Sequence, residues 1–122
     1  MTAPRLIITA MLVNVDLYKG KVFIPTMAQT EAGFYIGTDP VEVANANDVL
    51  GIREAFKRAL AHGNPLIPTP TRAHFPKPIL LKYTGAKSVA TYEKYVRSWH
   101  IELKDNDVEI TPLRPRNDRG LE

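Results

Sequence analysis

The stretch MLVNVDLYKGKVFIPT, residues 11–26, predicts a β-hairpin that begins the fold. Apolar and polar side chains alternate over residues 13–17, and this period of two is typical of a strand with one buried face. A two-residue loop at Lys19-Gly20 places Leu17 opposite Val22, so that both strands bury the same face. We therefore expect a sheet to which the remaining segments add.

Three further segments extend this sheet. The short alternating pieces GFYIGT (33–38) and VEV (41–43) predict a third strand and an edge. The segment WHIELKDNDVEI, residues 99–110, predicts a closing hairpin with Asp105-Asn106 as its loop. The register that follows pairs four apolar residues across the two strands: Leu103 with Val108, and Ile101 with Ile110.

The chain between these hairpins predicts two helices. The first covers residues 47–63, with Asn47 or Asp48 as its cap and Gly63 at its end. A shorter helix begins after Ser88. The residues expected to face inward are Val49, Ile52, Phe56, Ala59 and Leu60 in the first helix and Val89, Tyr92 and Val96 in the second.

These elements predict an α+β fold, a mostly antiparallel sheet packed by one main helix and a shorter second helix. The length of 122 residues and the 44% hydrophobic content fit one domain over residues 1–122. We expect its polar, proline-broken end, about residues 112–122, to fray. No segment approaches the length of a membrane span, and no small-residue cleavage site follows the apolar run near the start, so we expect a cytoplasmic chain.

A proline-rich connector, GNPLIPTPTRAHFPKP, lies between the two helices at residues 63–78 and contains five of the ten prolines. Proline stops helices and forces extended backbone. The apolar residues indicate an ordered connector that packs on the sheet, with Leu66, Ile67 and Phe75 as anchors. Alternatively, the connector binds a partner, because a segment that is fixed in advance loses little entropy on binding.

Charge is distributed unevenly along the chain, although the net charge is only +3. Residues 22–52 contain no Lys or Arg, whereas residues 53–87 carry a basic block opposed by Glu54 alone. Such blocks steer charged partners. The acidic residues are Glu31, Asp39, Glu42 and Asp48, and the basic ones are Arg53, Lys57, Arg58, Arg72, Lys77, Lys82 and Lys87.

The three histidines offer little for catalysis. His74, beside Arg72 and Lys77, resembles half of a ribonuclease acid–base pair, with His100 as its candidate partner. His62 is better explained as a C-terminal residue of the first helix, where the helix dipole favours a positively charged side chain. The pattern therefore favours structural or binding roles for these residues.

Other catalytic patterns are missing from the sequence. The His, Asp and Glu residues do not have the spacing of metal ligands, and the chain has no cysteine. Neither standard glycine-rich phosphate loop occurs. We interpret the protein as not an enzyme, with no cofactor and no metal.

Two binding functions remain as hypotheses. Arg72, His74, Phe75 and Lys77 combine positive charge with an aromatic ring that stacks on bases in nucleic-acid-binding proteins, so a small RNA-binding protein that uses the Arg53–Lys87 block is the alternative. Nucleic-acid binding is disfavoured because these basic residues are scattered over two helices and a loop. The acidic block suits a basic protein partner, such as a nuclease.

Three segments resemble small bacterial immunity proteins of contact-dependent growth-inhibition systems: FIPTMAQTEAGFYIG (23–37), ALAHGNPLIPTPTRAHFPKPILLKY (59–83) and GAKS (85–88). The resemblance extends over Val22–Ser98. It implies a stoichiometric, noncatalytic inhibitor that binds the C-terminal toxin domain, often a nuclease, in the cytoplasm of the producing cell. Because these immunity proteins share no common functional motif, the resemblance assigns no binding residue by position.

The candidate partner-binding residues therefore come from the charge blocks and the connector. No residue is proposed as catalytic or metal-binding. The candidates are Glu31, Asp39, Glu42, Asp48, Arg72, His74 and Phe75.

Overall fold

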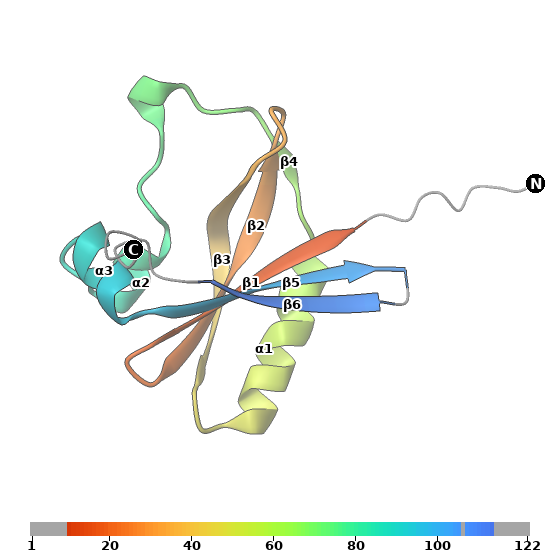
Figure 1. Ribbon diagram of the computed structural model, residues 1–122, viewed down its shortest axis with the longest axis vertical. Helices are drawn as coiled ribbons and strands as arrows, with labels where there is room; N and C mark the ends of the chain where they lie inside the picture. Colours follow the sequence, from red (N-terminus) through yellow and green to blue (C-terminus); the bar gives the residue numbers. More distant parts are fainter. Residues whose placement is uncertain (1–9, 106, 114–122) are drawn as a thin grey trace, which may run out of the picture.

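The computed structural model describes residues 10–105 and 107–113 and contains one six-stranded sheet with helices on both faces (Figure 1). The strand order is β3-β2-β1-β5-β6, and all of these pairs are antiparallel, while short β4 pairs with β2 in parallel. The elements are β1 (Met11–Tyr18), β2 (Lys21–Thr30), β3 (Tyr35–Asn45), α1 (Val49–His62), β4 (Leu66–Ile67), the 3-10 helix η2 (Arg72–His74), α2 (Leu80–Thr84), α3 (Val89–Tyr95), β5 (Arg97–Lys104) and β6 (Asp107–Leu113). The predicted α+β class is confirmed.

Both predicted hairpins have the expected register. Leu17 pairs with Val22 in the first hairpin, and the second pairs Leu103 with Val108 and Ile101 with Ile110. Lys19 and Gly20 both have positive φ, at 48° and 81°, as a two-residue turn that matches the strand twist requires. In the second hairpin, Asn106 lies outside the described residues. Strand β6 continues to Leu113, so it includes residues 112 and 113 of the segment that was expected to fray, and the rest of that segment lies outside the described residues.

The predicted third strand and separate edge form one strand, β3, which contains a bulge. Asp39 and Pro40 are the extra residues there. Pro25 of β2 has no backbone N–H to donate, which favours an interruption of the ladder at this point. Thr26 and Thr38 join the strands across the interruption, because the Thr26 hydroxyl donates to the Pro40 carbonyl (2.8 Å) and the Thr38 hydroxyl donates to the Thr26 carbonyl (2.9 Å).

Helix α1 begins and ends as predicted. The Asp48 carboxylate caps it by accepting the backbone N–H of Gly51 (2.9 Å), and Gly63 ends it at φ 69°. The prediction that Val49 faces inward is wrong, because its exposed fraction is 75%. Val49 follows the turn from β3 directly, so it lies ahead of the part of the helix that packs on the sheet. Ala55, which the prediction omitted, is fully buried there.

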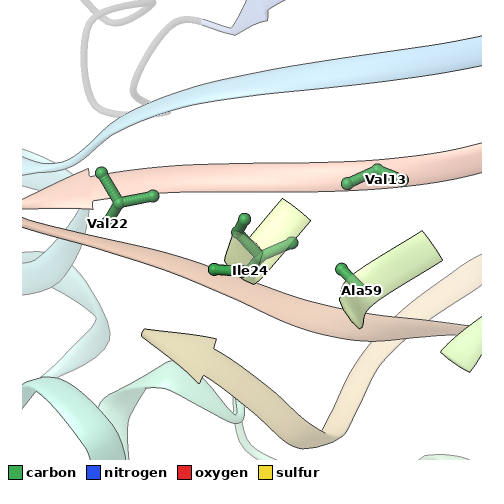
Figure 2. Packing of buried hydrophobic residues seen from close by; sticks show 5 residues of the cluster. Val13, Val22, Ile24 and Ala59 are labelled. Atoms are coloured by element: carbon green, nitrogen blue, oxygen red, sulfur yellow. The ribbon is translucent and has the colours of Figure 1, made fainter. Parts of the chain in front are cut away.

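The first core cluster lies between the sheet and α1. Figure 2 shows Val13 of β1 with Val22 and Ile24 of β2 and with Ala59 of α1. Ala55 and Ala59 have small side chains, which allow the helix to approach the strands closely. Ile24 is completely buried in this cluster.

The second core cluster covers the other face of the sheet. Tyr18 and Phe23 of the first hairpin pack there against Leu80, Tyr92 and Val96. Leu80 begins α2, a short helix that the sequence interpretation did not include, so the part of the chain that the structure describes has one main α-helix and two short ones. The predicted helix after Ser88 is confirmed as α3, although its first residue, Val89, is exposed instead of facing inward.

Asn64 joins the strands where β1 and β2 diverge. Its side chain accepts the Leu12 N–H (2.9 Å) and donates to the carbonyls of Leu12 (2.9 Å) and Met27 (2.7 Å). Just beyond, β4 pairs with Gln29 and Thr30 of β2. Strand β1 pairs with β2 only near their hairpin turn. At the other end of β2, the start of the connector therefore pairs with it instead.

Candidate partner-binding site

The connector and the β2–β3 turn form one exposed surface, which we call the connector surface and define as residues 31–34 and 66–77. In Figure 1 the connector leaves β4, arches past the tip of the β2–β3 hairpin and returns to α2. Backbone hydrogen bonds fix its first part, since Glu31 N–H donates to the Ile67 carbonyl (3.1 Å) and Ala32 N–H donates to the Thr69 hydroxyl (2.8 Å). The two segments are therefore held together as one unit.

An exposed aromatic pair lies on this surface. The rings of Phe34 and Phe75 stack with centroids 6.2 Å apart and planes at 26°. Their exposed fractions are 43% and 54%, so each ring keeps about half of its area in solvent. The prediction that Phe75 and Leu66 anchor the connector on the sheet is wrong, because both are exposed and Phe75 packs on the turn residue Phe34 instead.

Charged and polar groups flank the aromatic pair. Arg72 and His74 belong to η2, and both are exposed. The Thr71 hydroxyl accepts the backbone N–H of His74 (3.3 Å) and lies 3.1 Å from His74 Nδ1, which fixes the imidazole ring. Glu31 lies at the start of the turn. The connector surface therefore presents apolar, acidic and basic groups together.

The connector and the sheet enclose two cavities that both adjoin β3. One, of about 500 Å³, is lined by Asp39, His74 and Lys77 among apolar and proline residues. The other, of about 360 Å³, reaches Asp16 and Phe75 and shares Lys77 with the first. The two cavities also share Ile36, Gly37, Pro76 and Ile79.

Gly37 allows this close approach. A Cβ atom at position 37 would lie 3.2 Å from Cγ2 of Ile79, which is tighter than ordinary packing. Glycine at this position therefore lets the end of the connector pack directly against β3.

The predicted acidic block divides between the two faces of the sheet. Asp39 accepts hydrogen bonds from the Tyr83 hydroxyl and from Lys82 Nζ (3.1 Å), and these bonds lower the pKa of Asp39. Glu42 lies on the α1 side, where the Arg58 guanidinium (2.6 Å) and the His62 ring (2.9 Å) lower the pKa of its carboxyl. Both carboxylates therefore already have partners within the chain.

Glu31 and Asp48 lie at opposite ends of the β2–β3 hairpin. The ten residues of β2 separate these ends by about 33 Å at about 3.3 Å per residue. Asp48 caps α1, whereas Glu31 belongs to the connector surface. Of the seven candidate residues, the structure gathers Glu31, Arg72, His74 and Phe75 on the connector surface, places Asp39 in the adjoining cavity and leaves Glu42 and Asp48 beside α1.

The basic block is dispersed as well. Arg53, Lys57 and Arg58 belong to α1, whereas Lys82 belongs to α2 on the other face. Arg58 and Lys82 pair with Glu42 and Asp39 respectively. The residues proposed for RNA binding therefore do not form one continuous surface.

Asp16 and Tyr92, which line the smaller cavity, form a buried hydrogen-bonded pair that the sequence interpretation did not predict. Asp16 is buried and accepts hydrogen bonds from the Asn14 amide (2.8 Å) and from the Tyr92 hydroxyl. Burial and the neighbouring Asp16 charge raise the pKa of Tyr92. The alternation of Asn14 and Asp16 with apolar residues predicted a solvent-facing side for Asp16. Tyr92 was correctly predicted to face inward, but no local signal paired it with Asp16. Phe34 was missed too, because the sequence placed it in a strand and its contact with Phe75 depends on the tertiary fold.

The structure also locates the groups considered for catalysis. His62 pairs with Glu42, His74 contacts Thr71, and His100 lies in β5 opposite Asn14. His74 and His100 line no common cavity among those described. Within residues 10–105 and 107–113, His, Asp and Glu side chains form no cluster of three that fits a metal ion. No helix in the same ranges combines the length and apolar composition that crossing a bilayer demands.

Comparisons with known proteins identify a fold. No protein-family model matches the chain, and no curated protein matches it. Among solved structures, the Protein of Unknown Function NMB0488 from Neisseria meningitidis is similar, with a TM-score of 0.61 and 16% sequence identity over 92% of this chain and 76% of that one. At this identity, the similarity establishes that the two chains share a fold.

Proposed function

We propose that this protein is a noncatalytic immunity protein of a contact-dependent growth-inhibition system. It binds the C-terminal toxin domain, a nuclease, in the cytoplasm of the producing cell and neutralises it. The observation that carries this proposal is the exposed Phe34–Phe75 pair on the connector surface. Exposed aromatic rings next to charged groups are typical of the residues that supply most of the binding energy at protein interfaces.

The fixed connector supports a binding role. Five prolines restrict its backbone, and hydrogen bonds tie it to the β2–β3 turn. A surface that is already ordered loses little conformational entropy when a partner binds. The resemblance of residues 22–98 to immunity proteins supports a toxin domain as that partner.

The charges of the site fit a basic nuclease only in part. Asp39 and Glu42 pair within the chain, so Glu31 is the candidate carboxylate of the connector surface for a basic partner. We therefore expect a moderate effect of salt on association, smaller than four free carboxylates would give. Reversal of Glu31 to Lys is expected to slow association mainly by weakening electrostatic steering.

Co-expression with the toxin domain that the proposal expects to be encoded beside this protein tests the proposal. Growth should be restored by the wild-type chain, and the purified pair should form a one-to-one complex in which nuclease activity is lost. Persistent nuclease activity in the presence of excess immunity protein would overturn the proposal. Titration with a random RNA separates the alternative, since tight RNA binding that is lost in Arg53→Glu and Lys57→Glu variants would identify an RNA-binding protein instead.

A further inference from the structure

Strand β6 forms an edge of the sheet and exposes apolar side chains. It pairs with β5 on one side, and no described strand pairs with its other side. Val108 and Ile110 have exposed fractions of 60% and 59%. Natural proteins usually protect an edge strand, because its unpaired backbone groups accept strands from other chains.

A groove borders these side chains on the α1 face. It has a volume of about 470 Å³ and is lined by Trp99, Ile101 and Ile110 of the sheet and by Ile52 and Phe56 of α1. Helix α1 packs mainly on β2 and β3. Ile101 and Leu103 of β5 are partly buried at the margin of this cluster, whereas β6 is exposed along its whole length among the described residues. Arg53 and Lys57 of α1 complete the lining of the groove.

The opposite face of the same edge carries two carboxylates. Glu102 of β5 pairs directly with Glu109 of β6, and neither forms an ion pair within residues 10–105 and 107–113. Like charges directly opposite each other on neighbouring strands are unfavourable. A cation beside Glu109 would relieve this repulsion.

The hairpin register determines which backbone groups face outward. Lys104 and Asp107 flank the two-residue loop, so they form a hydrogen-bonded pair, as does every second pair after it. The backbone N–H and C=O groups of Val108 and Ile110 therefore point away from β5. Pro112 occupies the next outward position and has no N–H, which limits the free edge to the segment before it.

We propose that the β6 edge binds an extended segment of a partner protein in which apolar residues alternate with Lys or Arg. The segment pairs with the outward backbone groups of Val108 and Ile110. Its apolar side chains lie over the groove, and its basic side chains lie beside Glu109 on the opposite face. Arg53 and Lys57 repel basic groups from the groove side, so they disfavour the inverted orientation of the segment.

Charge makes a second copy of this chain a poor occupant. The antiparallel register that buries Val108 and Ile110 of both copies places the two Glu109 residues opposite each other. That arrangement would add a further carboxylate to the existing Glu102–Glu109 repulsion. A basic segment is complementary to the same positions.

Two synthetic peptides test this inference on the full-length protein without any toxin. One alternates Val with Lys, and the other alternates Val with Glu. We expect the Val–Lys peptide to bind about tenfold more tightly and to slow amide hydrogen exchange at Val108 and Ile110. Glu109→Lys should reverse the preference, whereas Glu31→Lys, on the connector surface, should leave it unchanged.

Ile110→Lys provides a second variant in which folding is preserved, because the Ile110 side chain is already exposed. It should abolish binding of the Val–Lys peptide. Unaltered exchange at Val108 and Ile110 with saturating Val–Lys peptide would overturn the inference, as would equal binding of both peptides. A stable homodimer with protected Val108 and Ile110 amides would likewise overturn it in favour of a second copy. Because these measurements use no toxin, their outcome is separate from that of the growth test.

Discussion

The two faces of the sheet differ in what they bury, although neighbouring residues of one strand contribute to both. Ile24 points into the apolar cluster under α1, whereas Phe23 points into the cluster formed with α2 and α3. The second face also buries Asp16, which is held by the Tyr92 hydroxyl. The difference shows that a period of two identifies which residues share a face but does not tell whether the other face is exposed.

The packing of the α1 face was easier to predict than that of the other face, because its contacts join segments that are closer in the sequence. Helix α1 follows β3 after a short turn, and its apolar stripe is visible in the sequence. The second face depends on contacts such as Asp16 with Tyr92, which are 76 positions apart. The connector that brings them together has no periodic pattern.

The largest effect is expected in the apolar cluster. Ile24→Ala removes a fully buried side chain and should lower the free energy of unfolding by about 2–5 kcal/mol. Val49→Ala, at an exposed position of α1, should change it by less than about 0.5 kcal/mol. Urea unfolding of both variants measures the difference, and similar costs would show that α1 is placed wrongly.

A smaller effect is expected on the second face. Tyr92→Phe leaves the Asp16 carboxylate buried with one donor fewer, which should cost about 1–3 kcal/mol. A double-mutant cycle with Asp16→Asn should give a coupling energy above about 0.5 kcal/mol. Additive effects in that cycle would contradict the proposed contact between β1 and α3.

The smallest effect concerns the ion pairs on the two faces. Glu42 is mostly buried against Arg58 and His62, whereas Asp39 is more exposed beside Lys82. Glu42→Gln should cost about 1 kcal/mol at neutral pH, because hydrogen bonds to a charged group are lost but Arg58 is half exposed. Asp39→Asn should have a lesser effect, because exposed pairs contribute little.

The pH dependence of these variants sharpens the test. Folding lowers the pKa of Glu42, so its contribution is present above the ordinary Glu value of 4.5 and is lost as the pH falls through the folded-state pKa. Unfolding measured from neutral to acidic pH should therefore show wild type and Glu42→Gln converging in acid. A constant difference across that range would contradict the ion pair.

Much of the fold was predictable from the sequence because its signals are local. Lys19-Gly20 and the alternation around it predicted the register of the first hairpin, and Asp48 and Gly63 predicted the limits of α1. The sequence predicted that the connector is ordered, but it did not predict the path that the connector takes. Proline restricts the backbone without specifying which part of the protein the segment packs on. Phe75 therefore lies on Phe34 instead of on the sheet.

The candidate site was less predictable because it depends on tertiary pairing. Glu31, Arg72, His74 and Phe75 come together through the hydrogen bonds between the turn and the connector. Glu42 and Asp39 looked like free acidic residues in the sequence, but they pair with cations from opposite faces. Charge counted along a chain does not reveal such pairing.

The affinity of the toxin domain for connector-surface variants tests the central claim most directly. Isothermal titration should show one-to-one binding by the wild type, and Phe75→Ala should weaken it about 30-fold, the equivalent of about 2 kcal/mol for a central aromatic contact. The Phe34→Ala variant should have a comparable effect, while Val49→Ala, an exposed apolar residue on α1, should leave the Kd unchanged. A wild-type Kd retained by the Phe34→Ala/Phe75→Ala double variant, or no binding of the toxin domain by the wild type, would contradict the account.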